Sequence, residues 1–219
     1  AIDAAPQNRF EFFEMLQPSA FARTSEALHA LATELQLARD TDPLNFVRHL
    51  TTRLYDAFDY EPASTSVDSP IDVALSTRRG VCQDFTHVMI ALLRLNGIPA
   101  RYVSGYLFHR EEWHDRSAED ASHAWVEAWI PDHGWLGFDP TNNLVCSERH
   151  IRVAVGRDYA DVPPTKGVYR GEASSSLGVS VSVQRIFELP EQPAPLQSPV
   201  DWSLSMQQRQ IQQQQQQQQ

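Results

Sequence analysis

The sequence predicts an α+β fold in which helices come first and a mostly antiparallel sheet follows. Apolar residues recur at helical spacing up to about residue 96, and the pattern then changes to that of strands rich in Tyr, Val, Trp and Phe. The two kinds of element do not alternate as a parallel βαβ sheet requires. A turn of hairpin length at residues 131–134 further favours antiparallel pairing of its two flanking strands.

Each expected helix has a recognisable beginning or end. Thr24 or Ser25 can cap the first helix, and Asp42 before Pro43 is a strong start signal for the second. A short third helix follows a Ser-Pro pair, and the fourth is apolar on nearly all sides, which predicts burial. The expected helices span about 24–39, 43–58, 70–79 and 82–96.

The strands are expected in the second half of the chain, where β-branched and aromatic residues concentrate. The last of them is predicted from valines that alternate with serines. Three tryptophans, at 125, 129 and 135, are expected to fill the core of the sheet. The expected strands span 101–108, 122–130, 135–139, 151–155 and 179–189.

Composition narrows the classes of partner. The chain has 219 residues, 18 Lys+Arg against 28 Asp+Glu, and a net charge of -10. A nucleic-acid-binding protein normally has a basic surface, so we expect no nucleic acid. Apolar stretches are far shorter than the roughly 20 residues of a spanning helix, and there is no polybasic run, so we expect no membrane partner. The chain begins with Ala1 without a signal-peptide pattern, and the expected location is cytoplasmic.

Three regions are expected along the chain. Residues 1–23 are an apolar segment interrupted by prolines that should pack on the body of the protein. Residues 24–189 form a single domain. Residues 190–219 are rich in Pro, Gln and Ser, and the last 13 residues contain 11 glutamines, so this tail should be disordered.

Three side chains of the expected domain could act together. Cys82 begins the buried helix just after a glycine, where free amide groups and the helix dipole favour a thiolate. His123 and Asp139 lie on the two strands of the predicted hairpin, toward the same end. An imidazole–carboxylate pair approached by a thiol supplies a nucleophile, a base and an orienting acid. Alone, each has an ordinary interpretation: a small buried thiol, a partly buried histidine and a turn-forming aspartate.

The motifs around these residues resemble the transglutaminase-like domain family, and most closely its bacterial branch described as candidate cysteine proteases. The resemblance covers about residues 24–165. It rests on three motifs in order and at the family's spacing, supported by shorter matches at 60–62, 68–70, 74–75 and 97–106; the motifs are RGVCQDFTH (79–87), SHAWVE (122–127) and GFDPT (137–141). The resemblance implies a papain-like fold, with the cysteine helix packed on an antiparallel sheet, and a catalytic triad of Cys82, His123 and Asp139.

The expected chemistry is acyl transfer through a thioester, most simply the hydrolysis of amide bonds in a protein or peptide substrate. A transglutaminase, in which an amine accepts the acyl group, is the alternative. The Cys82 backbone N–H is the natural first oxyanion donor, with Tyr60 and Gln83 as candidates for a second. We expect no cofactor and no bound metal, and no calcium loop of the EF-hand kind occurs in the sequence.

Other interpretations use the same residues differently. Cys82, His123, Asp139 and Cys146 have the residue types of a zinc site, although no close ligand pair such as C-x-x-C is present. A Cys82–Cys146 disulfide could act as a redox lock, and the fold could serve as a non-enzymatic binding module. His87, five residues after Cys82 on the helix, should point away from the thiol and pack in the core.

Overall fold

A computed structural model describes residues 12–37, 42–66, 69–109, 113–164, 167 and 180–186. The chain divides into two units, 1–184 and 185–219, and the fold described here is that of the first unit. The expected tail at 190–219 lies outside the described residues. The predicted domain boundary at residue 189 also lies outside them and stays a prediction.

Helices dominate the first half of the described chain and strands the second, as the periodicity predicts. The helices are α1 (Phe13–Leu16), α2 (Glu26–Glu34), α3 (Pro43–Ala57), α4 (Ile71–Thr77), α5 (Cys82–Leu95) and the 3-10 helix η1 (Tyr159–Asp161). The strands are β1 (Asp59–Tyr60), β2 (Arg79–Gly80), β3 (Ala100–Leu107), β4 (His123–Ile130), β5 (Gly134–Asp139), β6 (Leu144–Val145) and β7 (His150–Gly156).

The main sheet has five strands in the order β6-β5-β4-β3-β7, and every neighbouring pair is antiparallel. This confirms the predicted α+β class with its antiparallel sheet. A second, two-stranded sheet was not predicted: β1 pairs in parallel with β2, immediately before α5. Two residues per strand are too few to produce a periodic signal, so only the tertiary contact reveals this sheet.

The helix caps that the sequence indicates are formed. The Ser25 hydroxyl accepts the Leu28 N–H at the start of α2, and the Asp42 carboxylate accepts the Leu44 N–H at the start of α3. Each bond satisfies an amide that would otherwise lack a partner at the helix end. The helix predicted at 24–39 is α2, which ends at Glu34 and is therefore shorter than predicted.

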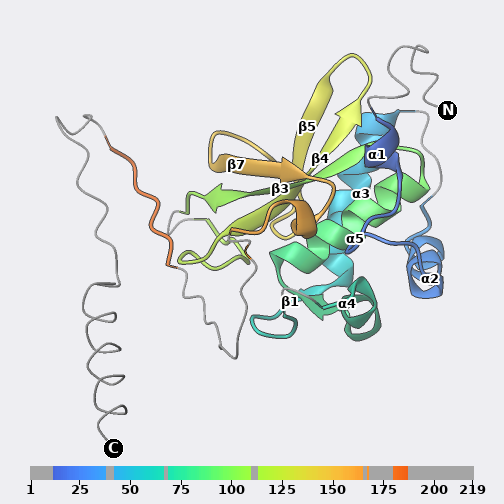
Figure 1. The fold of residues 1–219 in the computed structure, drawn as a ribbon, viewed down its shortest axis with the longest axis horizontal. Coiled ribbons are helices and arrows are strands. Elements are labelled where there is room, and N and C mark those ends of the chain that lie inside the picture. Colours follow the sequence, from blue (N-terminus) through green and yellow to red (C-terminus); the bar gives the residue numbers. More distant parts are fainter. Residues whose placement is uncertain are drawn as a thin grey trace, which may run out of the picture. The chain divides into compact units, whose positions relative to one another are not determined.

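Helix α5 lies against β3 and β4 and is the centre of the core (Figure 1). Its residues from Asp84 to Arg94 are all buried, and the apolar run at 88–93 predicts this for the middle of the helix. On the facing side of the sheet, the small and branched residues Ala124, Val126 and Ala128 of β4 belong to the same core cluster. Because side chains alternate along a strand, His123, Trp125 and Glu127 lie on the opposite face.

The three tryptophans are therefore placed differently from the prediction. Trp125 is buried, but it is not part of the core cluster against α5. Trp129 and Trp135 pair across β4 and β5 and are partly exposed, with the Phe12 ring packed on both. Trp125 and Trp129 are both odd residues of β4 and therefore share the face away from α5. Trp135 lies on the same face because it pairs with Trp129 across the hairpin.

The strand predicted at 179–189 is not found in its described part, residues 180–186. Val181 donates a backbone hydrogen bond to the Asp120 carbonyl at 3.1 Å, and Val181 and Val183 are half-buried. An extended segment becomes a strand only when a partner strand continues the ladder, and sequence alternation alone does not reveal that partner. None of the described helices is long and apolar enough to cross a membrane.

Residues 12–22 are held to the body by the buried Arg94 side chain of α5. Its guanidinium donates hydrogen bonds to the carbonyls of Met15 and Gln17 and to the Ser19 hydroxyl. It also donates to the Ala100 carbonyl on β3. The one charged side chain on an otherwise apolar stretch of α5 thus satisfies backbone acceptors from two parts of the chain.

Candidate active site

Cys82 is the first residue of α5, and the chain just before it is arranged to begin the helix there. The Asp84 carboxylate turns back and accepts the Val81 N–H at 2.8 Å, which satisfies one of the unpaired amides of the first turn. A Cβ atom on Gly80 would lie 2.7 Å from the Asp84 Cβ, so only glycine leaves room for this carboxylate. The Cys82 side chain is half-buried, and its thiol is not part of a disulfide.

Asp84 also ties the loop after β1 to the start of α5. The Thr65 hydroxyl donates to the Asp84 Oδ2 at 2.5 Å. Burial raises the pKa of the Asp84 carboxyl, while the bonds from Thr65 and Val81 act in the opposite direction. Asp84 lies within the motif at 79–87, and no role was predicted for it from the sequence. Its position three residues into the helix is the signal that could have identified it as a cap.

His123 and Asp139 meet at one end of the β4–β5 hairpin, as their places on the two strands predict. The His123 Nε2 lies 2.7 Å from the Asp139 Oδ2, and both side chains are almost fully buried. His123 begins β4 and Asp139 ends β5, so the hairpin brings the two strand ends together. The distance is that of a strong, charge-assisted hydrogen bond.

The Asp139 carboxylate is held by its own turn. Its Oδ1 accepts the backbone N–H groups of Thr141 and Asn142 at 3.0 and 3.2 Å, and its Oδ2 accepts the Asn142 side-chain amide at 2.8 Å. Burial alone would raise the pKa of this carboxyl, but the imidazoles of His123 and His150 hold it well below its usual range. Asp139 is therefore an ionised acceptor inside the protein.

Cys82 lies near the other side of the His123 ring. The Cys82 Sγ is 4.0 Å from the carbonyl oxygen of Ser122, the residue before His123. Burial would lower the pKa of His123, but Asp139 and Cys82 together raise it to about 10. The Nδ1 of this ring is buried and makes no formed hydrogen bond within the described chain. The imidazole thus has one nitrogen engaged by a carboxylate and a second nitrogen free to exchange a proton with the thiol.

Of the two oxyanion candidates, Tyr60 lies at the end of the small parallel sheet that precedes α5. Burial and the proximity of Cys82 both raise the pKa of its phenol, which places the hydroxyl in the electrostatic reach of the thiol. Gln83 is the second residue of α5 and is half-buried. The parallel pairing of Tyr60 with Gly80 explains how a residue distant in sequence approaches Cys82.

Two residues that sequence reasoning missed also contact Asp139. Asn142 donates to the carboxylate and accepts the backbone N–H of Arg116 at 2.7 Å, so it joins the Asp139 turn to the loop before β4. His150, the first residue of β7, places its Nε2 3.3 Å from the Asp139 Oδ2. Proximity in sequence could have suggested Asn142, whereas nothing in the local sequence indicates that His150 reaches this site.

The zinc site envisaged from Cys82, His123, Asp139 and Cys146 does not assemble among the described residues, where the group with metal-ligating geometry is His123, Asp139 and His150. Ligand atoms around tetrahedral zinc are about 3.3 Å apart, as bonds of about 2.0 Å require. The 2.7 Å between His123 and Asp139 is instead a hydrogen-bond distance. As they lie, the three residues form a hydrogen-bonded group centred on the Asp139 carboxylate.

Neither Cys146 nor His87 takes part in the hydrogen bonds between His123, Asp139 and His150. Cys146 packs against Gly137, where a Cβ would lie 2.8 Å from its sulfur, and burial raises the pKa of its thiol. His87 points into the core as predicted: its Nε2 accepts the Tyr159 N–H, and its ring stacks on Phe21. Both cysteines are free thiols, so no Cys82–Cys146 disulfide is formed.

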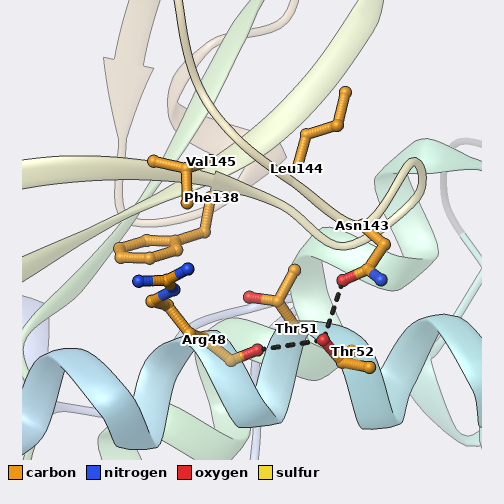
Figure 2. A pocket seen from close by; sticks show the side chains of 7 residues that line it. All are labelled: Arg48, Thr51, Thr52, Phe138, Asn143, Leu144 and Val145. Atoms are coloured by element: carbon orange, nitrogen blue, oxygen red, sulfur yellow. Dashed lines mark hydrogen bonds between the residues drawn. The ribbon is translucent and has the colours of Figure 1, made fainter.

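A pocket of about 270 Å³ lies behind the Asp139 turn, between α3 and the β5–β6 connection (Figure 2). The Thr52 hydroxyl bridges the Arg48 carbonyl on α3 and the Asn143 side-chain oxygen, which ties the turn after Asp139 to the helix. Phe138, next to Asp139, forms one wall. The pocket is lined by Arg48, Thr51, Thr52, Phe138, Asn143, Leu144 and Val145, none of which belongs to the Cys82–His123–Asp139 group.

Comparison with known proteins gives a consistent result. The family model of the transglutaminase-like superfamily matches residues 30–140. ML0607, an uncharacterized protein of Mycobacterium leprae, is 40% identical over 176 residues, which cover 80% of this chain and 62% of the relative. The chain thus spans less than two thirds of the length of this relative.

Two further matches carry names with an activity. The "Protein-glutamine gamma-glutamyltransferase" of Pseudomonas aeruginosa is 34% identical over 162 residues, which cover 65% of this chain and 23% of that protein. The crystal structure of a "Putative Cysteine Protease" from Cytophaga hutchinsonii superposes with a TM-score of 0.58 at 30% identity. That match covers 70% of this chain and 49% of the other.

Proposed function

The chain belongs to the transglutaminase-like superfamily, and from this premise we propose that it is a thiol-dependent acyl-transfer enzyme with Cys82, His123 and Asp139 as its catalytic residues. One observation carries the proposal: a buried imidazole is held by an ionised carboxylate through Nε2 while its other side faces a thiol at a helix N-terminus. This is the arrangement in which a histidine can accept a thiol proton and later return it.

In the reactive state the proton of the Cys82 thiol is on the His123 Nδ1, either by transfer as the reaction begins or because the pair rests as thiolate and imidazolium, which the raised pKa of His123 favours. The sulfur attacks the carbonyl carbon of an amide, and the C–N bond breaks as the imidazolium protonates the leaving amine. The product is a thioester on Cys82. Water or a second amine then attacks the thioester and gives up a proton to His123. The C–S bond breaks, the acyl group leaves as a carboxylic acid or a new amide, and the imidazolium returns its proton to the Cys82 sulfur.

Asp139 acts on this sequence through His123. Its negative charge keeps the imidazole proton on Nε2, so that Nδ1 is the nitrogen that takes and returns the thiol proton. The carboxylate itself stays ionised, because its five donors satisfy both of its oxygens. The backbone N–H of Cys82 faces the developing oxyanion, and Tyr60 is the better placed second donor because its phenol lies within electrostatic reach of Cys82.

Hydrolysis of a peptide or protein amide is the preferred reaction, and amine transfer is the second candidate. The structural match to a protein named as a cysteine protease favours water as the acceptor. The match to a protein named as a glutamine γ-glutamyltransferase favours an amine. Both reactions share the same first half, so they are distinguished only by what attacks the thioester.

The test compares the two cysteines of the chain. Iodoacetamide at pH 7 should label Cys82 first and abolish turnover, and Cys146→Ala should behave like the wild type because its buried thiol lies outside the mechanism. Turnover is measured with peptide amides alone and with a glutamine peptide plus an amine, and Cys82→Ala should be inactive with both. Equal turnover by the wild type and Cys82→Ala would refute the thiol mechanism.

A further inference from the structure

His150 is the third side chain that contacts the Asp139 carboxylate, after His123 and Asn142. The mechanism above does not use it. Its side chain is 2% exposed, and its Nε2 lies 3.3 Å from the same oxygen, Oδ2, that binds His123. The ring is packed edge-on against Trp125, with centroids 5.3 Å apart at 74°. Resting on the proposed function, we propose that His150 is a positioning residue that donates a hydrogen bond to Asp139 and thereby orients His123 toward Cys82.

The neighbouring backbone determines which nitrogen of His150 carries the proton. The Ser147 N–H donates to the His150 Nδ1 at 3.3 Å, so Nδ1 is an acceptor and cannot carry a hydrogen in this arrangement. A neutral ring must then carry its proton on Nε2, the nitrogen that faces Asp139. The Nε2–H of a neutral His150 therefore points at Asp139, as the Nε2–H of His123 does, but its Nδ1 is occupied by a backbone amide and does not exchange a proton with the thiol.

An irregularity in the sheet brings His150 to this position. The pairing of β3 with β7 shifts register between Ser104 and Gly105, a β-bulge that changes which side chains of β7 face the site. A Cβ on Gly105 would lie 2.2 Å from the Ile151 carbonyl oxygen and 2.6 Å from the Trp125 ring. Only glycine permits β7 to approach so closely, and this approach places His150 against Trp125 and Asp139.

The consequence is a carboxylate whose Oδ2 is held by donors from three parts of the fold. The Asp139 Oδ2 accepts from His123, from Asn142 and from His150, which come from β4, from the turn after β5 and from β7. Without the donor on β7, the carboxylate is held only by its own turn and by His123, so it and the imidazole bonded to it gain freedom to tilt. The distance between the His123 Nδ1 and Cys82 depends on that tilt, so proton transfer should slow while substrate binding remains.

Other ionisable groups near the pair are few among the described residues. Cys82 approaches His123 from α5. His109, two residues after the end of β3, also interacts electrostatically with His123. Cys146 faces Asp139 from the segment before β7. Each of these groups is unchanged in the variants below, so a difference between variants reports on His150.

Two substitutions separate the hydrogen bond from the packing. His150→Phe keeps a ring against Trp125 and removes the donor, whereas His150→Gln places an amide N–H where Nε2 was. We expect His150→Phe to lower kcat and the rate of Cys82 alkylation about 10-fold with little change in KM, since a positioning defect of this kind costs about that much or more. His150→Gln should recover most of both rates.

A spectrum of the wild type supplies a readout that needs neither a substrate nor a variant. Long-range ¹H–¹⁵N NMR at pH 7 should show His150 as the neutral Nε2–H tautomer, and the low-field proton on the His123 Nε2 should shift in His150→Phe and return in His150→Gln. An Nδ1–H tautomer or a charged His150 would overturn the inference, as would equal impairment of the two variants or wild-type rates in His150→Phe. A failure of the proposed function would appear separately, as ordinary reactivity of Cys82 in the wild type.

Discussion

Two histidines of this protein are equally buried and have opposite acid–base properties. His123 and His87 are each 3% exposed, yet the pKa of His123 is raised to about 10 and that of His87 is lowered to about 4. Burial disfavours the charged imidazolium at both positions. The difference comes from the hydrogen-bond partner of each ring. The Asp139 carboxylate accepts a hydrogen bond from the His123 Nε2, whereas the His87 Nε2 accepts a backbone N–H from Tyr159.

A carboxylate does lie near His87, but its oxygens are engaged elsewhere. Asp158 is buried and accepts the backbone N–H groups of Phe21 and Ala160 at 2.8 and 2.9 Å. It raises the pKa of His87 only through space, and the nearby Arg94 lowers it. A direct hydrogen bond to a carboxylate is therefore what distinguishes His123 from His87. Asp158 binds two backbone amides, whereas Asp139 binds the imidazole of His123.

The largest effect is expected from removing the charge that distinguishes His123. Asp139→Asn should lower kcat by about 10³- to 10⁴-fold, because a neutral amide cannot stabilise the imidazolium and can present an N–H that reverses the imidazole tautomer. Steady-state kinetics on the substrate found in the turnover screen measures this. The matched control is Asp158→Asn, which removes a buried carboxylate outside the site. Because Asp158 binds backbone amides and not His123, this variant should change kcat less than about 3-fold. Similar losses in both variants would refute a special role for Asp139.

The second effect is on stability at low pH and concerns His87. Its pKa is about 4 in the folded protein and about 6.5 in the unfolded chain, so between these values only the unfolded chain takes up the proton. Stability is therefore lost as pH falls from 6.5 toward 4, by on the order of 2–3 kcal/mol from this group. Urea unfolding between pH 7 and pH 4 measures the loss.

The matched variant for that experiment is His87→Gln, whose side-chain oxygen can still accept the Tyr159 N–H but does not titrate. It should begin less stable at pH 7, because the stacking on Phe21 is lost. Its decline toward pH 4 should be shallower than that of the wild type. Parallel declines in the two proteins would show that His87 does not resist protonation.

The smallest effect tests the role assigned to Asp158. Asp158→Asn leaves one of the two N–H groups from Phe21 and Ala160 without its acceptor, which should cost about 1 kcal/mol of unfolding free energy at pH 7. Loss of the negative charge should move the pKa of His87 further down. An NMR titration of the His87 ring protons follows this, and a shift toward an ordinary histidine value would contradict the account of the two rings.

Much of the architecture was predictable because it follows from local chemistry. Asp42-Pro43 specifies a helix start, the uniformly apolar 88–93 segment specifies a buried helix, and the turn at 131–134 joins two strands, all within a few residues of chain. The segment at 180–186 was predicted wrongly because alternation describes a strand's faces and not its partner. The assignment of Cys82, His123 and Asp139 to catalysis stays a prediction until the turnover and alkylation experiments are done.

By itself, the sequence determined the class of fold and the family through its motifs, because these depend on residue type and on short-range order along the chain. That Cys82, His123 and Asp139 act together is what the motifs predict. Only the tertiary structure decided which nitrogen of His123 meets Asp139, why His87 is kept neutral, and that His150 reaches the same carboxylate from β7. Such features depend on side-chain contacts between different elements of the fold, which no local stretch of sequence specifies. Sequence periodicity specifies the face of a strand, and only packing specifies what that face meets.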